Sequence, residues 1–129
     1  MDIEYVILLK NQSNHKIDGY LGANEHYPDT TVVETNFRRS LNPGSSIDFS
    51  AKRPWEEIFE RYVLSDTLSM FIFHTDTLEA NSWETIISEY KVLQRYDLSI
   101  QDIHLLNHDI PYPPTEQMKD MRMYPPYEE

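Results

Sequence analysis

Apolar and polar residues alternate along the first part of the chain, which predicts strands. Residues 2–11 are apolar on one side, and both sides become apolar midway, as in a strand at the centre of a sheet. After a turn at residues 11–14, residues 16–23 alternate again and predict an antiparallel partner, in which glycines ease a twist or bulge. Residues 30–37 predict a weaker strand.

Four further strands are predicted downstream. "NPGS" at residues 42–45 suits a type II turn, because glycine stands at the third position, where φ must be positive. A short strand should follow, and two stronger ones are expected at residues 67–75 and 91–98. Residues 108–113 are also extended, and their prolines confine them to the edge of a sheet.

Three segments switch to helical spacing. They cover residues 53–62, 81–90 and 99–107. Trp55 and Trp83 each begin an apolar stripe, which predicts that they pack against the sheet and do not form a carbohydrate platform. The sequence also predicts Pro54 at the first helical position, capping boxes at Asn81–Glu84 and Ser99–Asp102, and a helix end at Asn107.

About seven strands with two or three short helices indicate a mainly β protein, an antiparallel β-sandwich of the immunoglobulin-like type. The alternative is an α+β sheet with helices on one face. We expect residues 1–114 to form a single β-rich domain. Residues 115–129, marked by prolines, should form a strap packed on that domain, burying Tyr112, Met118, Met121 and Tyr124. The alternative is an exposed polyproline-type ligand for a partner.

Composition narrows the class of protein. The chain of 129 residues is 40% hydrophobic and 12% aromatic, which is too apolar for a disordered chain. It has no cysteine, so thiol catalysis, disulfides and thiolate metal sites are excluded. No apolar run reaches the length of a membrane span, and the first residues do not resemble a signal peptide.

The net charge of −11 is unevenly distributed. Residues 1–53 hold seven acids and six bases, whereas residues 54–129 hold fifteen acids and five bases. The negative electrostatic field of residues 54–129 repels phosphate backbones and anionic membranes, so nucleic acid is not an expected partner. It can attract a basic partner, or it can simply keep the protein in solution.

Two pairs of residues are weak candidates for a metal site. His74 and Asp76 should alternate outward from the end of a strand, so their side chains would lie on one face. His104 and His108 have the i, i+4 spacing of two zinc ligands on a helix, but Leu105 stands where a zinc protease has its glutamate. Neither pair has the third ligand that a metal needs, so ordinary polar surface residues explain them as well.

No motif for catalysis or cofactor binding is present. The sequence lacks a nucleophile elbow, a P-loop and a dinucleotide-binding glycine pattern. We therefore predict no catalytic residue and no cofactor, and a protein that is not an enzyme.

Several stretches together resemble a family of small proteins from Bacteroides-type gut bacteria, many of them predicted lipoproteins. They include "PWEEIFE", "DTLSMFIFHTDTLE", "SWETIISEYKVLQRYDLSIQDIHLLN" and "YPPTEQMKDMRMYPPYEE". The resemblance covers most of the chain from Tyr27 onward. It implies an exported protein, in the periplasm or anchored to the outer membrane by a lipid on a removed leader, although a cytoplasmic location stays open. It supplies no activity, ligand or catalytic residue.

An exported origin suggests a modification. The resemblance draws attention to Thr30, Thr67 and Thr77, each of which follows an aspartate as in the O-glycosylation sequon of such bacteria. The alternative is that aspartate and threonine simply favour turns before strands.

Three functional hypotheses follow. The first is a non-catalytic module of the cell envelope, structural or binding a protein or an envelope glycan. The second is an acidic partner-binding protein, similar to an inhibitor or immunity factor. The third, a metal-dependent enzyme using the histidine pairs, has the least support.

Overall fold

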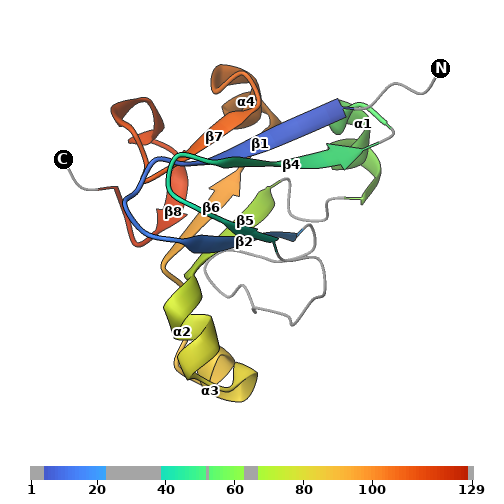
Figure 1. Cartoon of the computed structure of the whole chain (residues 1–129). Helices are drawn as coiled ribbons and strands as arrows, with labels where there is room; N and C mark the ends of the chain where they lie inside the picture. Colours follow the sequence, from blue (N-terminus) through green and yellow to red (C-terminus); the bar gives the residue numbers. More distant parts are fainter. Residues whose placement is uncertain (1–4, 23–38, 52, 63–66, 128–129) are drawn as a thin grey trace.

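The strands form two sheets, and four short helices connect or cover them. The structure is a computed structural model that describes residues 5–22, 39–51, 53–62 and 67–127. In these residues the strands are β1 (Tyr5–Asn11), β2 (Ile17–Gly22), β3 (Arg39–Leu41), β4 (Ser46–Ala51), β5 (Leu68–His74), β6 (Gln94–Leu98), β7 (Asp109–Tyr112) and β8 (Arg122–Tyr124). The helices are α1 (Trp55–Tyr62), α2 (Thr75–Ala80), α3 (Trp83–Ser88) and α4 (Ile100–Leu105) (Figure 1).

The smaller sheet has the order β4-β1-β7 and the larger the order β3-β2-β5-β6-β8. β1 is central in its sheet, as predicted, but its predicted partner was wrong, because β2 belongs to the other sheet and pairs with β3 and β5. β1 pairs instead with β4 in antiparallel and with β7 in parallel orientation. β7 lies at an edge, as predicted from its proline.

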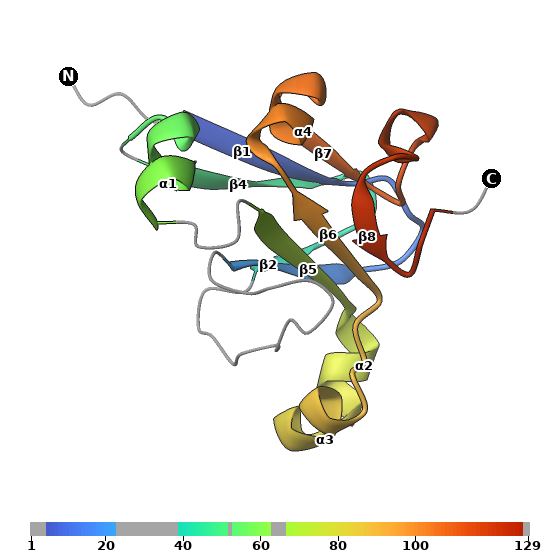
Figure 2. The same cartoon turned by 180° about the vertical axis from the view of Figure 1, so that it is seen from behind.

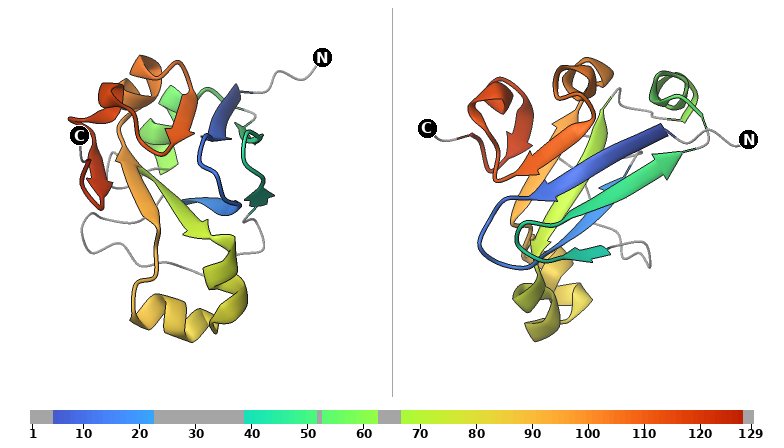
Figure 3. Two further views of the ribbon diagram at one scale, coloured as in Figure 1. Left: turned by 60° about the vertical axis from the view of Figure 1, so that its left-hand side comes forward. Right: turned by 45° about the horizontal axis from the view of Figure 1, so that its top comes forward.

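The chain passes repeatedly between the sheets. β1, β4 and β7 lie in one sheet, and the strands between them in the chain lie in the other. α1 carries the chain from β4 to β5, and α4 carries it from β6 to β7. Figures 2 and 3 show these two helices near each other at one end of the molecule, with α2 and α3 at the opposite end.

One apolar cluster joins the two sheets. Its members come from β1, β4 and β7 on one side and from β2, β3, β5, β6 and β8 on the other. α1 adds Trp55 and Phe59, α4 adds Ile103, and the residue after α4 adds Leu106. Gly19 on β2 allows a close approach, because a Cβ there would lie 2.6 Å from Cδ2 of Leu9 on β1. The burial of Trp55 confirms the core position predicted for it.

The outer face of the larger sheet carries a second cluster. Phe71 and Phe73 of β5 pack there with Leu78 of α2, Ile86 of α3 and Val92. β5 is therefore buried on both faces, which explains its almost uninterrupted apolar sequence. The described chain is rich in strands and has helices at both ends of the sheets, so a mainly β or α+β class is confirmed.

β6 buries an ion pair in this outer layer. Arg95 and Asp97 are each 1% exposed, and the guanidinium Nε donates to Asp97 Oδ2 over 3.1 Å. The hydroxyl of Ser69 donates to the other carboxylate oxygen over 2.6 Å, and Arg95 Nη1 also bonds the hydroxyl of Tyr90. The buried charges are thus paired and hydrogen-bonded, as burial requires.

Several local predictions are confirmed. Ser45 N–H donates to the carbonyl of Asn42, and Gly44 has φ of 80°, as a type II turn requires. Ser99 and Asp102 form the predicted capping box of α4. α1 begins at Trp55, one residue later than predicted, and the carbonyl of Pro54 accepts its first hydrogen bonds.

Two local features differ from the predictions. The strand predicted at residues 67–75 is confirmed as β5, but the helix α2, which was not predicted, follows it directly at Thr75, whose hydroxyl donates to Asp18 Oδ1 of β2 at 2.8 Å. The capping box predicted at Asn81 and Glu84 does not form. The Asn81 amide instead donates to the carbonyl of Thr77 at the end of α2, and the Ser82 hydroxyl caps α3.

The C-terminal segment packs against the domain through its methionines. Met118, in the 3-10 turn Glu116–Met118, is fully buried, and Met121 and Tyr112 are also buried. Tyr124 was expected to be buried but is 44% exposed, because β8 turns it away from the core while Met123 faces inward. The helical turn expected across Met118 and Met121 is limited to this 3-10 turn, and β8 was not predicted.

Two expectations lie outside the described residues. They are the strand predicted at residues 30–37 and the packing of the Trp83 side chain.

Met118→Ala should lower the free energy of unfolding by about 2–5 kcal/mol, because it removes a fully buried side chain and leaves a cavity. Lys119→Ala, at the exposed neighbouring position, should change it by less than about 0.5 kcal/mol. Urea unfolding of both variants measures the difference. If the two variants are equally stable, burial of Met118 in the C-terminal segment does not stabilise the fold.

Asp97→Ala should cost about 3–5 kcal/mol of stability, because it leaves the buried Arg95 without its carboxylate. The double variant Arg95→Met with Asp97→Ala should lose less than the single variant, since no charge is then left buried. Thermal and urea unfolding of the two variants give the comparison. A double variant less stable than Asp97→Ala would show that Arg95 stabilises the fold through other contacts.

Candidate functional site

The two helices that cross between the sheets bring a carboxylate and two imidazoles together. Glu56 lies in the first turn of α1 and His104 in the last turn of α4. His104 Nε2 is 2.6 Å from Glu56 Oε1, although the residues are 48 positions apart in the chain. The ring centroid of His108 lies 5.7 Å from that of His104. We call Glu56, His104 and His108 the α1–α4 cluster.

The end of α4 sets the position of His108. Asn107 and His108 have φ of 55° and 64°, in the left-handed region that few non-glycine residues adopt. The His108 N–H bonds back to the carbonyl of Ile103, and the His108 carbonyl accepts from Leu8 of β1. The helix therefore ends before His108, as the sequence indicates. His104 and His108 lie near each other through this turn and not through i, i+4 spacing on a helix.

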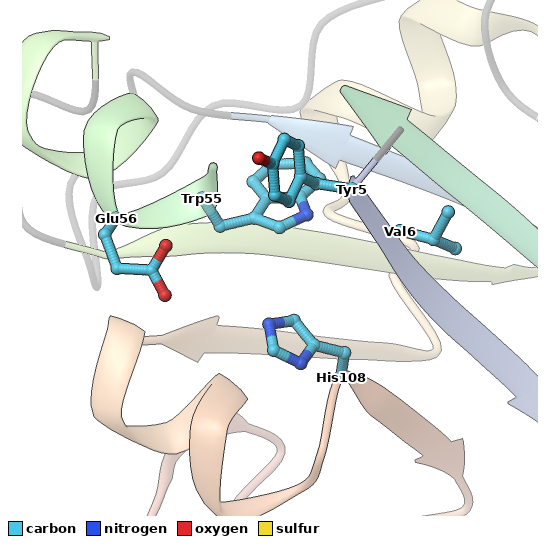
Figure 4. Close-up of a pocket in the computed structure, with 5 residues that line it drawn as sticks. All are labelled: Tyr5, Val6, Trp55, Glu56 and His108. Carbon is cyan, nitrogen blue, oxygen red and sulfur yellow. The ribbon is translucent and has the colours of Figure 1, made fainter. Parts of the chain in front are cut away.

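Two pockets flank Glu56. The first, with a cavity volume of about 340 Å³, is lined by Tyr5, Val6, Trp55, Glu56 and His108 (Figure 4). The second, of about 410 Å³, is lined by Glu56, Phe59, Glu60, Ser99, Ile100 and Gln101. Glu56 therefore lines both pockets, and each pocket combines apolar side chains with polar ones.

The environment of Glu56 favours its charged form. A hydrogen bond with its own backbone and the hydrogen bond with His104 lower the pKa of Glu56 below its usual 4.5, and the charges of His104 and His108 add to this. Its side chain is 56% exposed, so water screens these interactions. Glu56 is thus an ionised acceptor near neutral pH.

Trp55 contributes a polar atom as well as apolar surface. It is 6% exposed, and its Nε1, a hydrogen-bond donor, has no partner in the described structure. Figure 4 shows the nitrogen on the edge of the indole that faces Val6 and His108. An unpartnered buried donor is uncommon and favours a ligand that supplies an acceptor.

The α1–α4 cluster does not form a metal site in the described residues. In this part of the chain, no group of three or more histidine, cysteine, aspartate or glutamate side chains is placed to hold a metal ion. The cluster can bind polar groups. Ser99, the serine that lines the second pocket, is occupied in the capping box, where its hydroxyl accepts from the Asp102 N–H.

The other predicted pair is not built as expected. His74 ends β5, whereas Asp76 lies in the first turn of α2, so the two do not alternate along one strand. His74 Nδ1 is 4.0 Å from Asp76 Oδ2, and Asp76 is highly exposed. His74 stacks instead on His15, with ring centroids 4.5 Å apart, a contact that sequence reasoning missed.

The threonines of the possible glycosylation sites lie in different places. Thr30 is outside the described residues. Thr67, just before β5, and Thr77, within α2, are both partly exposed. Their exposure leaves the modification as a prediction.

The best-buried carboxylates are used for structure. Asp18 accepts hydrogen bonds from Ser40 and Thr75, and Asp97 pairs with Arg95. Asp102 completes the capping box of α4. These acids stabilise the fold, whereas the acids around the α1–α4 cluster face solvent.

The chain was compared with protein-family models, with curated proteins and with solved structures, and none of the three comparisons gives a match. None of the helices in the described ranges has the length and apolar character needed to cross a membrane.

Glu56→Gln should lower stability at pH 6 by about 0.2–1 kcal/mol, the range for an exposed charge pair. Because the folded-state pKa of Glu56 is lowered, this stability is present above pH 4.5 and is lost as the pH falls through the lowered value. The stabilities of the two proteins should therefore converge as the pH falls below this lowered pKa, measured by urea unfolding.

Glu84→Gln, an exposed acid on α3, is the control and should show no such convergence. If the difference in unfolding free energy between wild type and Glu56→Gln increases as the pH is lowered, the pairing of Glu56 with His104 is not stabilising.

Proposed function

We propose that the protein is a non-catalytic binding module of the cell envelope and that the two pockets around Glu56 are its binding site. The observation that carries the proposal is the unpartnered indole donor of Trp55 beside an ionised carboxylate. A binding site needs a few convergent polar groups on an apolar surface, and this region has both.

Among the described residues that line these pockets, none is a nucleophile paired with a base, which supports binding over catalysis. Export rests on the family resemblance given above, as does a lipid anchor on a removed leader. An immunoglobulin-like sandwich is part of the same proposal. One apolar cluster between the two sheets supports it. The parallel pairing of β1 with β7 differs from the pairing in a purely antiparallel sandwich.

A second candidate is an acidic protein that inhibits or neutralises a basic partner. The concentration of fifteen acids in residues 54–129 favours it, because a one-signed field speeds the encounter with a partner of opposite charge. Association of this kind should weaken steeply as salt is added.

The proposed binding predicts capture that depends on the pockets. Immobilised protein is incubated with a detergent extract of envelopes, and bound proteins and glycans are identified. A component retained by wild type should be lost with the double variant Glu56→Ala, His108→Ala, because the variant removes two of the polar groups that line the first pocket.

Glu79→Ala with Glu84→Ala, on α2 and α3, is the matched control and should retain the component. Identical capture by all three proteins would exclude the pockets as the binding site. Isothermal titration of the identified component then gives its affinity.

A further inference from the structure

The charges around the two pockets point to the chemistry of the ligand. Glu56 and Glu60 stand four residues apart on α1, so their side chains are neighbours on one helix face, and both line the second pocket. Like charges at this spacing repel each other. The described residues that line the two pockets include no lysine or arginine. A bound cationic group would relieve the repulsion.

The neighbouring acid is already paired. Glu57 Oε1 accepts from Arg53 Nη1 over 2.8 Å. The acids among the described residues that line the second pocket are Glu56 and Glu60. Glu56 also bonds His104 through one oxygen, Oε1. A carboxylate has two oxygens and about four acceptor positions, so it can accept from a ligand at the same time.

The ligand must also supply an acceptor. Trp55 Nε1 donates only, and a purely cationic group cannot satisfy it. The nitrogen has less than 1 Å² of accessible area, so a side chain that covers it must shift before an acceptor can reach it. Tyr5 and Val6, which are partly exposed, border the first pocket together with Trp55.

The second pocket adds an apolar requirement. Phe59 and Ile100 line it beside the two carboxylates, and each packs against the main apolar cluster. A ligand that fills both pockets therefore presents a cation, a hydrogen-bond acceptor and an apolar group within one short stretch.

We infer that the pockets around Glu56 bind a basic, partly apolar polypeptide segment of a partner protein. A lysine or arginine meets Glu56 and Glu60, a backbone carbonyl accepts from Trp55 Nε1, and an apolar side chain packs on Phe59 and Ile100. A neutral glycan would satisfy the indole but would bring no positive charge to Glu60 and none to Glu56 beyond that of His104 and His108. This inference rests on the proposed function and assigns its ligand class.

The test uses the full chain labelled with ¹⁵N and two probes. One probe is an acetylated octapeptide of alternating lysine and leucine, and the other is the neutral sugar chitohexaose. The peptide should shift the indole signal of Trp55, assigned with Trp55→Phe, and the amide signal of His108 (Figure 4). An octapeptide of alternating glutamate and leucine should shift neither signal.

Charge-matched variants separate the site from the general acidity of the protein. Glu56→Gln with Glu60→Gln should weaken binding of the lysine peptide about tenfold, because two charge pairs are lost. Glu79→Gln with Glu84→Gln removes the same charge at the far end of the molecule and should weaken binding less than about twofold (Figure 1). Melting temperatures of both variants confirm that they are folded.

Equal weakening by the two double variants, or an unmoved indole signal, would overturn the inference. If chitohexaose moves these signals and the lysine peptide does not, the ligand class is wrong while the proposed binding function stands. If neither probe binds, the inference fails, and the envelope capture experiment decides the proposed function separately.

Discussion

The apolar layer between the two sheets is the interaction on which the rest of the structure depends. Because the chain changes sheet after β1, β3, β4, β6 and β7, five of the seven connections between the described strands must cross this layer or its rim. α1 and α4 are two of these connections, and both bury residues in the layer. Their mutual position follows from that burial, so the contact between Glu56 and His104 is a consequence of core packing and not its cause.

Periodicity in the sequence predicted most elements but not how they pair. The apolar run of β5 and the capping box at Ser99 are local signals, and both were interpreted correctly. The predicted pairing of β1 with β2 was wrong. A hairpin is the default for neighbouring strands, but here β2 pairs with β5 in the larger sheet, and its Gly19 packs face to face against Leu9 of β1 in the smaller sheet. α2 was missed because its single buried apolar residue, Leu78, gives no helical period.

The sequence indicated only the two histidines of the α1–α4 cluster. His104 and His108 attracted attention through a spacing that the structure does not use, since the left-handed turn at Asn107 brings them together. Nothing local in the sequence connects Glu56 with α4. Its partner is 48 residues away and is chosen by the crossing of the two helices. Contacts of this kind depend on topology, which a single sequence does not specify.

The division of the polar groups explains why a binding site lies on the connecting helices and not on the sheets. Carboxylates on the larger sheet, such as Asp18 and Asp97, are buried and fully engaged, so altering them would destabilise the fold. Glu56 and Glu60 project from α1 into solvent, while the same helix is anchored through Trp55 and Phe59. Polar residues of α1 can therefore change with little effect on the apolar layer. A binding surface built in this way can adapt to its partner without losing the core that holds its two helices together.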